Sequence, residues 1–227
     1  MLKIDKIYQR YYGDRKLYDK KQFNIKEGIT VLCGCNGSGK TTLLKQFKDY
    51  IESNYSDQIS NKEVKLITFD ENGIEGRFHA DKLFLNEEYS EMATDLFSSE
   101  GERRFDRFGY VIKQIGQAVK EKYKTIVCLI DGLDSGVSIE LLRYYSEGLQ
   151  FVEKEVKKEG IELCILLTTN QYELTKGFKC LDITSLTELV FNDYQHYCNY
   201  IMHNKEIKDK RIIEAQERAE RKERRNG

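Results

Sequence analysis

Short apolar runs bounded by turn-forming residues predict the strands of a buried sheet. The runs ITVLC at 29–33, TIVCLI at 125–130 and LCILLTT at 163–169 are almost continuously apolar. Such runs are typical of strands that are covered on both faces. The run VKLITF at 64–69 has a similar composition and leads into DENG, which is a turn signal.

Longer stretches between these runs repeat apolar residues at helical spacing. They predict helices after residue 40, from 103 to 124, and from 138 to 160, with Ser138 as the N-cap and Gly160 as the stop. Strands that alternate with helices predict an α/β fold, in which a mostly parallel sheet has helices on both faces.

The two ends of the chain depart from this alternation. Residues 1–30 contain short alternating runs and two turn signals, which predict N-terminal antiparallel strands. Residues 73–97 are polar and mixed, and we expect a small helical subdomain at about 73–124. The main domain is then expected to span 1–204, and a charged helix or tail to occupy 205–227.

Composition adds little to this organisation. The 227 residues carry a formal charge of −1, which argues neither for nor against a nucleic-acid partner. The apolar runs are too short to cross a bilayer, and no secretion signal is recognised, so we expect a cytoplasmic protein without membrane insertion. The six cysteines show no CxxC spacing and are interpreted as reduced thiols.

A glycine-rich segment between the first buried strand and the following helix carries the main functional signal. Residues 34–41, GCNGSGKT, fit the pattern G-x4-G-K-[ST] of a phosphate-binding loop. A glycine-rich turn that only caps a helix is the alternative, but the flanking strand and helix favour ATP and Mg²⁺ as ligands. The candidate nucleotide-binding residues of this segment are Gly34, Asn36, Gly37, Ser38, Gly39, Lys40, Thr41 and Thr42. Lys40 is expected to reach the β- and γ-phosphates and Thr41 to bind Mg²⁺.

The stretch NGSGKTTLL resembles the phosphate loop of ABC-type ATPases, a group that includes transporter subunits, SMC proteins and related DNA-repair and defence ATPases. The resemblance covers residues 1–190 and includes the N-terminal strands. It implies that an aromatic residue of these strands stacks on adenine, and Tyr12, which precedes a glycine, is the candidate, with Tyr11 close behind. A half-buried strand aromatic without a ligand is the alternative reading of Tyr12.

The segment SSEGE at 98–102 matches the signature S-x-G-[QE] of the same family. The resemblance implies that Ser99, Gly101 and Glu102 contact the γ-phosphate bound by a second protomer, so that two chains close head to tail around ATP. An ordinary capping box is the alternative, because Ser99 and Glu102 are three residues apart. Only 57 residues separate Thr41 from Ser99, which leaves no room for a coiled-coil insertion and favours a compact, stand-alone protein over a transporter subunit.

Two positions depart from the family pattern at the reacting bond. Asp131 ends an apolar strand and is the expected Mg²⁺ ligand, but Gly132 occupies the position of the general-base glutamate. Asn170 stands where the family usually has a histidine, and asparagine carries neither a proton nor a charge. Asp134 lies beyond the strand end, so we do not expect it to replace the base. Lys40, Asp131 and Asn170 are the candidate catalytic residues, and hydrolysis is expected to be weak or absent.

The final stretch, 205–227, holds nine Lys or Arg against six Asp or Glu, with Glu–Arg pairs four residues apart. It is either a solvated helix or a basic contact for nucleic acid or an acidic partner.

The leading hypothesis is an ATP-driven homodimer, or a hetero-oligomer with a second protein, that switches a partner or clamps nucleic acid. The alternatives are an active ABC-type ATPase of a repair or defence complex, the ATP subunit of a transporter and, more remotely, a P-loop kinase or GTPase.

Overall fold

The computed structural model describes the backbone of residues 2–8, 10–70 and 100–226, and the side chains of these residues except 100–107 and 225–226. A six-stranded sheet forms the centre of the molecule, with the order β10-β9-β5-β8-β7-β6. Its neighbouring strands are parallel, apart from the antiparallel pair β9 and β10. The strands are β5 (Gly28–Cys33), β6 (Val64–Asp70), β7 (Thr125–Asp131), β8 (Glu162–Thr169), β9 (Lys179–Asp182) and β10 (Glu188–Leu189).

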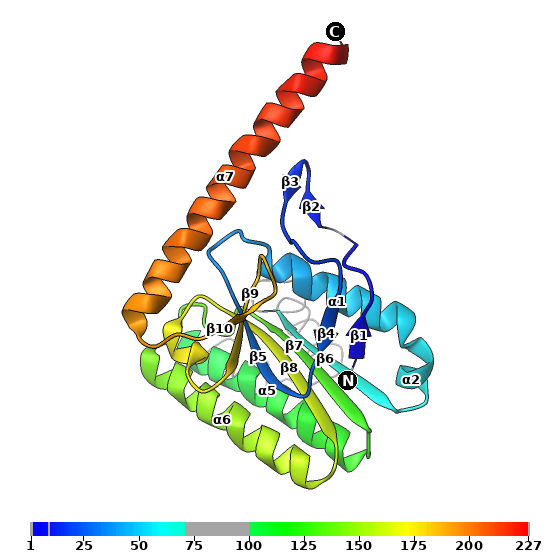
Figure 1. The fold of residues 1–227 in the computed structure, drawn as a ribbon. Helices are drawn as coiled ribbons and strands as arrows, with labels where there is room; N and C mark the ends of the chain where they lie inside the picture. Colours follow the sequence, from blue (N-terminus) through cyan, green and yellow to red (C-terminus); the bar gives the residue numbers. More distant parts are fainter. Residues whose placement is uncertain (1, 9, 71–99, 227) are drawn as a thin grey trace.

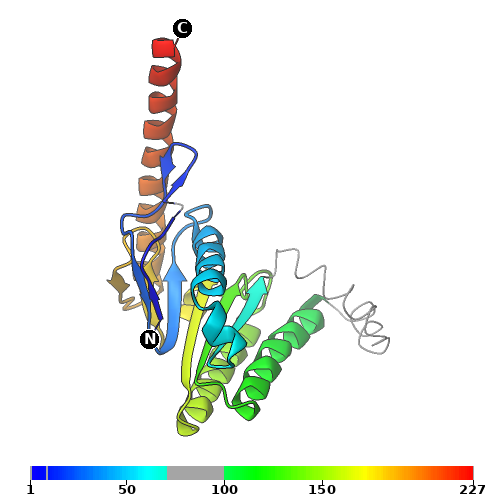
Figure 2. The same ribbon diagram turned by 90° about the vertical axis from the view of Figure 1, so that its right-hand side faces the viewer.

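Helices cover both faces of this sheet (Figures 1 and 2). One face carries α1 and α2, and the other carries α5 and α6. The helices are α1 (Lys40–Asn54), α2 (Ser56–Ser60), α5 (Glu100–Lys120), α6 (Ile139–Lys158) and α7 (Tyr194–Asn226), and a 3₁₀ turn spans Tyr172–Thr175. The predicted α/β class and the mostly parallel sheet are therefore confirmed.

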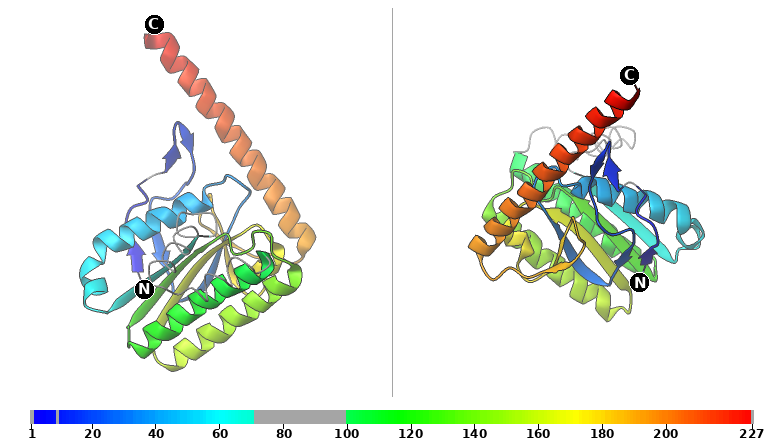
Figure 3. Two further views of the ribbon diagram at one scale, coloured as in Figure 1. Left: turned by 180° about the vertical axis from the view of Figure 1, so that it is seen from behind. Right: turned by 45° about the horizontal axis from the view of Figure 1, so that its top comes forward.

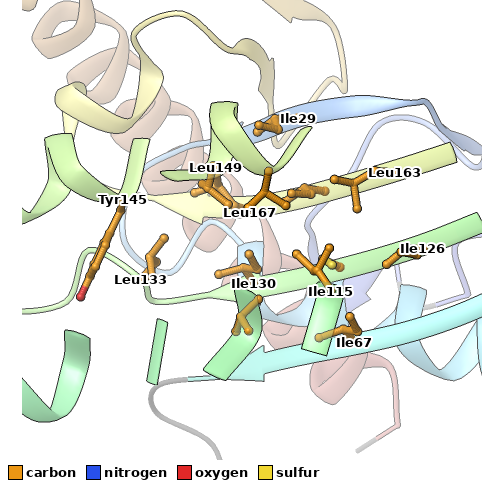
Figure 4. Close-up of a cluster of buried hydrophobic side chains, with 14 of the residues drawn as sticks. Ile29, Ile67, Ile115, Ile126, Ile130, Leu133, Tyr145, Leu149, Leu163 and Leu167 are labelled. Atoms are coloured by element: carbon orange, nitrogen blue, oxygen red, sulfur yellow. The ribbon is translucent and has the colours of Figure 1, made fainter. Parts of the chain in front are cut away.

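Alternation along each strand explains why the sheet can be covered on both sides. In β7, Ile126, Cys128 and Ile130 belong to the apolar cluster under α5 and α6. Val127 and Leu129 belong to the cluster under α1. The first cluster is drawn in Figure 4, where side chains of the strands meet those of α5 and α6.

The N-terminal strands pair antiparallel, as the sequence predicts. β1 (Leu2–Ile4) pairs with β4 (Phe23–Ile25), and β2 (Tyr11–Tyr12) pairs with β3 (Arg15–Lys16) as a short hairpin. The side chains of β1 and β4 pack into the same cluster as α1, so this layer lies over the α1 side of the sheet.

The stretch 73–124, expected to form a small helical subdomain, is described from Glu100 onward. Within α5, the buried residues Phe108, Val111 and Ile115 pack into the cluster on the α5–α6 face of the sheet. This part of the stretch is therefore a covering helix of the central domain. Residues 71–99 lie outside the described residues.

The C-terminal helix α7 runs for 33 residues and projects away from the sheet past the β2–β3 hairpin (Figure 3). It begins at Tyr194, so the charged stretch from residue 205 continues a helix that has already contacted the domain. The expected Glu–Arg pairs form along it, from Glu214–Arg218 to Glu220–Arg224. No described helix combines the length and the apolar character that a bilayer span requires.

Candidate functional site

The glycine-rich loop joins the end of β5 to the start of α1, at the carboxyl edge of the parallel strands. Gly39 begins the helix with a φ of 107°, a left-handed conformation that favours glycine. A Cβ at Gly39 would lie 2.8 Å from the hydroxyl of Tyr18, which is fully buried and donates a hydrogen bond to the Gly39 carbonyl at 2.6 Å. This packing fixes the loop so that the first amides of α1 are available to an anion.

The Lys40 side chain folds back over the glycine-rich loop and donates hydrogen bonds to its carbonyl oxygens. Its ammonium group donates to the carbonyl oxygens of Gly34 at 2.7 Å and Cys35 at 3.2 Å, and to Oδ1 of Asn170 at 2.9 Å. The side chain is 8% exposed, and burial lowers its pKa from 10.5, against the opposing charges of nearby acidic groups such as Asp134 and Asp131. A bound phosphate group would offset this effect of burial on the Lys40 pKa, because it would add negative charge beside the ammonium group.

Asp131 ends β7 next to the loop. Its Oδ1 accepts a hydrogen bond of 2.5 Å from Thr168 on the adjacent strand β8. The Thr168 hydroxyl in turn accepts from the amide of Gly132 at 3.3 Å. The threonine thus holds the carboxylate at the edge of the sheet, where Thr41 also lines the same pocket.

Thr41 and Asp131 fit a magnesium ion in their chemistry. Both offer oxygen, which Mg²⁺ prefers, and Mg²⁺ is usually held by one or two protein groups together with water and substrate phosphates. In the part of the chain that the structure describes, no cluster of three His, Cys, Asp or Glu suited to a metal occurs.

Asp134 belongs to the same site, although the sequence placed it beyond the strand end. A turn closed by the hydrogen bond from the Ser135 amide to the Gly132 carbonyl, at 3.0 Å, brings it back toward β8. Its Oδ2 accepts from the amide of Asn170 at 2.5 Å and from the Thr169 hydroxyl at 2.9 Å. The carboxylate is 5% exposed and fixes the backbone that carries Asn170.

A pocket of about 550 Å³ collects these groups at the carboxyl edge of the sheet. Of the residues expected from the sequence, it is lined by Tyr12, Asn36, Gly37, Gly39, Lys40, Thr41, Thr42, Asp131 and Asn170. The remaining loop residues lie beneath this lining, where Gly34 accepts from Lys40 and Ser38 is buried. The pocket also includes Arg15, Leu17, Asp134, Thr168 and Gln171, which the sequence analysis did not assign, and Gly132, Ser135 and Gly136.

The sequence around the glycine-rich loop matches a known protein family. The family described as AAA domain matches residues 24–176, which is more than half of the chain and includes the strand, loop and acidic strand end that build the pocket. The chain belongs to the AAA domain family. Among curated proteins, none matches it. The chain therefore has the fold of a P-loop nucleoside triphosphatase, and residues 34–41 are its nucleotide-binding loop.

The mouth of the pocket in this AAA domain is formed by the β2–β3 hairpin. Tyr12 is 66% exposed, and the guanidinium of its cross-strand partner Arg15 lies 5.7 Å from the ring centroid. Arg15 also donates to the Gly37 carbonyl at 3.2 Å, which ties the hairpin to the glycine-rich loop. An exposed ring and a cation therefore border the loop, and Arg15 was missed because its relevance depends on strand pairing.

The contact that residues of the SSEGE segment were expected to make with nucleotide stays a prediction. Ser99 lies outside the described residues, whereas Gly101 and Glu102 lie in the first turn of α5. Their side chains also lie outside the described part of the chain.

The helix α7 supplies a support for the loop that the sequence analysis missed. Asn204 is 3% exposed, and its Oδ1 accepts from the amide of Cys35 at 2.9 Å. Its amide nitrogen donates to Asp182 at 3.2 Å and to Thr184 at 3.3 Å. One turn later, Lys208 donates to the Asn36 carbonyl at 3.1 Å. Asn204 is the last residue before the charged stretch of α7, and an asparagine at the position of helical spacing from Tyr197 and Tyr200 is the sequence signal that would have indicated this contact.

Proposed function

We propose that this AAA domain binds ATP with Mg²⁺ and acts as a nucleotide-gated switch in which binding matters more than turnover. The observation that carries the proposal is a pocket with a complete binding apparatus but no side chain at residue 132. The loop, Lys40, Thr41 and Asp131 all border this pocket. Membership of the AAA domain family supports nucleotide binding at this pocket.

Each part of a nucleotide would meet a suitable group of the chain. The loop amides and Lys40 would hold the phosphates, and Thr41 and Asp131 would hold Mg²⁺, which supplies charge neutralisation at the phosphates when bound. The exposed ring of Tyr12 would receive the base. The Asn170 side-chain oxygen accepts from Lys40, which leaves the amide N–H₂ group as a donor toward a terminal phosphate.

Slow hydrolysis is expected because Gly132, the residue after Asp131, provides no side chain that could act as a general base. Gly132 has a φ of 76°, a backbone conformation that disfavours a residue with a side chain. Loss of a positioned base typically lowers the rate by about 10²–10⁴. From a median enzyme turnover of about 10 s⁻¹, this gives about 0.1 to 0.001 s⁻¹.

The means of switching would be ABC-type dimerisation, as the resemblance of the loop and of SSEGE implies. Ser99, Gly101 and Glu102 of one protomer would complete the phosphate site of the other. Ser135 and Gly136 border the pocket, where such a partner would approach. A dimer held by ATP would then act on a second protein or clamp nucleic acid.

Two measurements on the full chain test this proposal. Titration with a fluorescent ATP analogue should show Mg²⁺-dependent binding that Lys40→Ala abolishes, and gel filtration should show self-association with ATP–Mg²⁺. The matched variant Ser99→Arg should still bind nucleotide and stay monomeric. Binding without any change in size, in every nucleotide state, would remove the dimer from the proposal.

An active ATPase is the second candidate, because Asp134 places a buried carboxylate in the pocket. Its Oδ2 already accepts hydrogen bonds from the Thr169 hydroxyl and the Asn170 amide, which hold the carboxylate against β8. Steady-state phosphate release separates the candidates: turnover of several per second that is lost in Lys40→Ala and in Asp134→Asn would favour the active enzyme.

A further inference from the structure

A second concave surface lies between the N-terminal layer and the edge of the central sheet. This groove has a volume of about 750 Å³ and shares no lining residue with the nucleotide pocket. It runs between β4 and the β9–β10 edge, over Thr30 in the middle of β5. Five lysines line it against a single glutamate, Glu188; they are Lys3, Lys20, Lys21, Lys26 and Lys179.

Most of this positive charge remains available to a ligand. Lys179 pairs with Glu188, and Lys3 pairs with Asp5 at 2.7 Å. Lys20 donates to the carbonyl oxygen of Leu186 at 3.0 Å, which fixes the side chain without neutralising it. Within the described residues, Lys21 has no ion pair, and it is exposed. The groove is therefore basic in a chain whose total formal charge is −1.

The floor of the groove argues against an apolar or amphipathic ligand. Its apolar residues are Phe23, Leu181 and Leu186, which are 9%, 6% and 5% exposed because they already pack into the core. A docking peptide would find no apolar pocket to fill. Phe23 is the only aromatic residue of the lining, so the groove has no exposed ring on which unpaired bases could stack.

We infer that this groove binds the phosphate backbone of double-stranded nucleic acid. Lysines act as flexible point charges toward phosphate and carry no base specificity. The exposed side chains of Gln22, Asn24 and Thr187 add neutral hydrogen-bonding groups of the kind that contact backbone oxygens. Recognition would be independent of sequence and sensitive to salt. It does not rest on nucleotide binding at the loop.

The test uses the full chain and a labelled 20-base-pair duplex, followed by fluorescence anisotropy across a series of salt concentrations. The variant Lys21→Glu/Lys26→Glu reverses two exposed charges of the groove. We expect it to weaken binding at least tenfold at low salt. Each neutralised phosphate contributes about 0.9 to the slope of log affinity against log salt, so the slope should fall by about 2.

The matched control is Lys154→Glu/Lys157→Glu, which changes total charge equally on the exposed surface of α6. This helix packs on the face of the sheet opposite to β4, which lines the groove. We expect less than a threefold effect from this control. A third variant, Arg218→Gln/Arg221→Gln, checks the basic part of α7. Thermal melting of all variants should match the wild type, since the altered side chains are exposed.

Three results would overturn the inference. The wild type does not bind the duplex at low salt, the α6 or α7 variant loses as much affinity as the groove variant, or poly-glutamate displaces the duplex as effectively as an unlabelled duplex does. The last result would indicate an acidic protein as the ligand of the groove.

Discussion

Replacing Asn204 by alanine tests whether α7 is part of the phosphate loop's support. The substitution removes the acceptor for the buried Cys35 amide, while Asp182 keeps its hydrogen bond from Tyr200 at 2.7 Å. An unsatisfied buried donor costs about 1–3 kcal/mol, and the lost bonds to Asp182 and Thr184 add about 0.5–1.5 kcal/mol. We therefore expect the free energy of unfolding to fall by about 1.5–4.5 kcal/mol.

The same change should weaken nucleotide binding, because the loop must be ordered again when phosphate binds. A reordering cost of about 1–2 kcal/mol corresponds to an affinity for ATP–Mg²⁺ lower by about 5- to 30-fold. Urea denaturation and analogue titration measure the two quantities on the same sample. The control is Ile213→Ala on the same helix, where the side chain is 56% exposed and a change within about 0.5 kcal/mol is expected.

The reasoning is refuted if Asn204→Ala unfolds at the same urea concentration as Ile213→Ala. A stability loss with unchanged affinity would limit α7 to packing and deny it a role in shaping the loop.

Three further changes test the site itself. Gly132→Glu should lower stability by about 1–2 kcal/mol and leave phosphate release slow, because the residue has a φ of 76°; rapid turnover in this variant would contradict the assigned conformation. Asp134→Ala should lower the free energy of unfolding by about 1–3 kcal/mol in urea denaturation, since it leaves the Asn170 amide without its acceptor, while the Thr169 hydroxyl keeps the Gln171 carbonyl at 3.2 Å. Burial lowers the pKa of Lys40, so the charged form that binds phosphate is lost at lower pH than for an ordinary lysine. Affinity for ATP should therefore begin to fall, as pH rises, before 10.5 is reached, and a flat profile up to that pH would count against the lowered pKa.

Local pattern was sufficient to predict the loop and the four strands β5, β6, β7 and β8, but not the short edge strands β9 and β10. ITVLC, TIVCLI and LCILLTT form β5, β7 and β8, because continuous apolar runs have few alternatives to burial between helices. Ser138 caps α6 as expected, with its side chain accepting from Leu141. These features depend on residues within a few positions of one another.

The parts that were not predicted depend on contacts between distant residues. The sequence shows only that Asp134 follows a strand, whereas in the structure the turn after Gly132 brings its carboxylate to the Asn170 amide, directly after β8. The contact of Asn204 with Cys35 joins residues 169 positions apart. Helix periodicity identifies an inward face but does not say which loop that face will meet.

The geometry of α7 has a mechanical consequence. From Asn204 to its last described residue the helix extends for about 33 Å at 1.5 Å per residue. If binding at the loop tilted its base by about 10°, the far end would move by about 6 Å, and the ion pair of 2.7 Å between Lys222 and Asp14 in the turn of the β2–β3 hairpin would break. A pair of fluorescent labels, one near residue 222 and one on α2, would report loop occupancy without any label in the pocket.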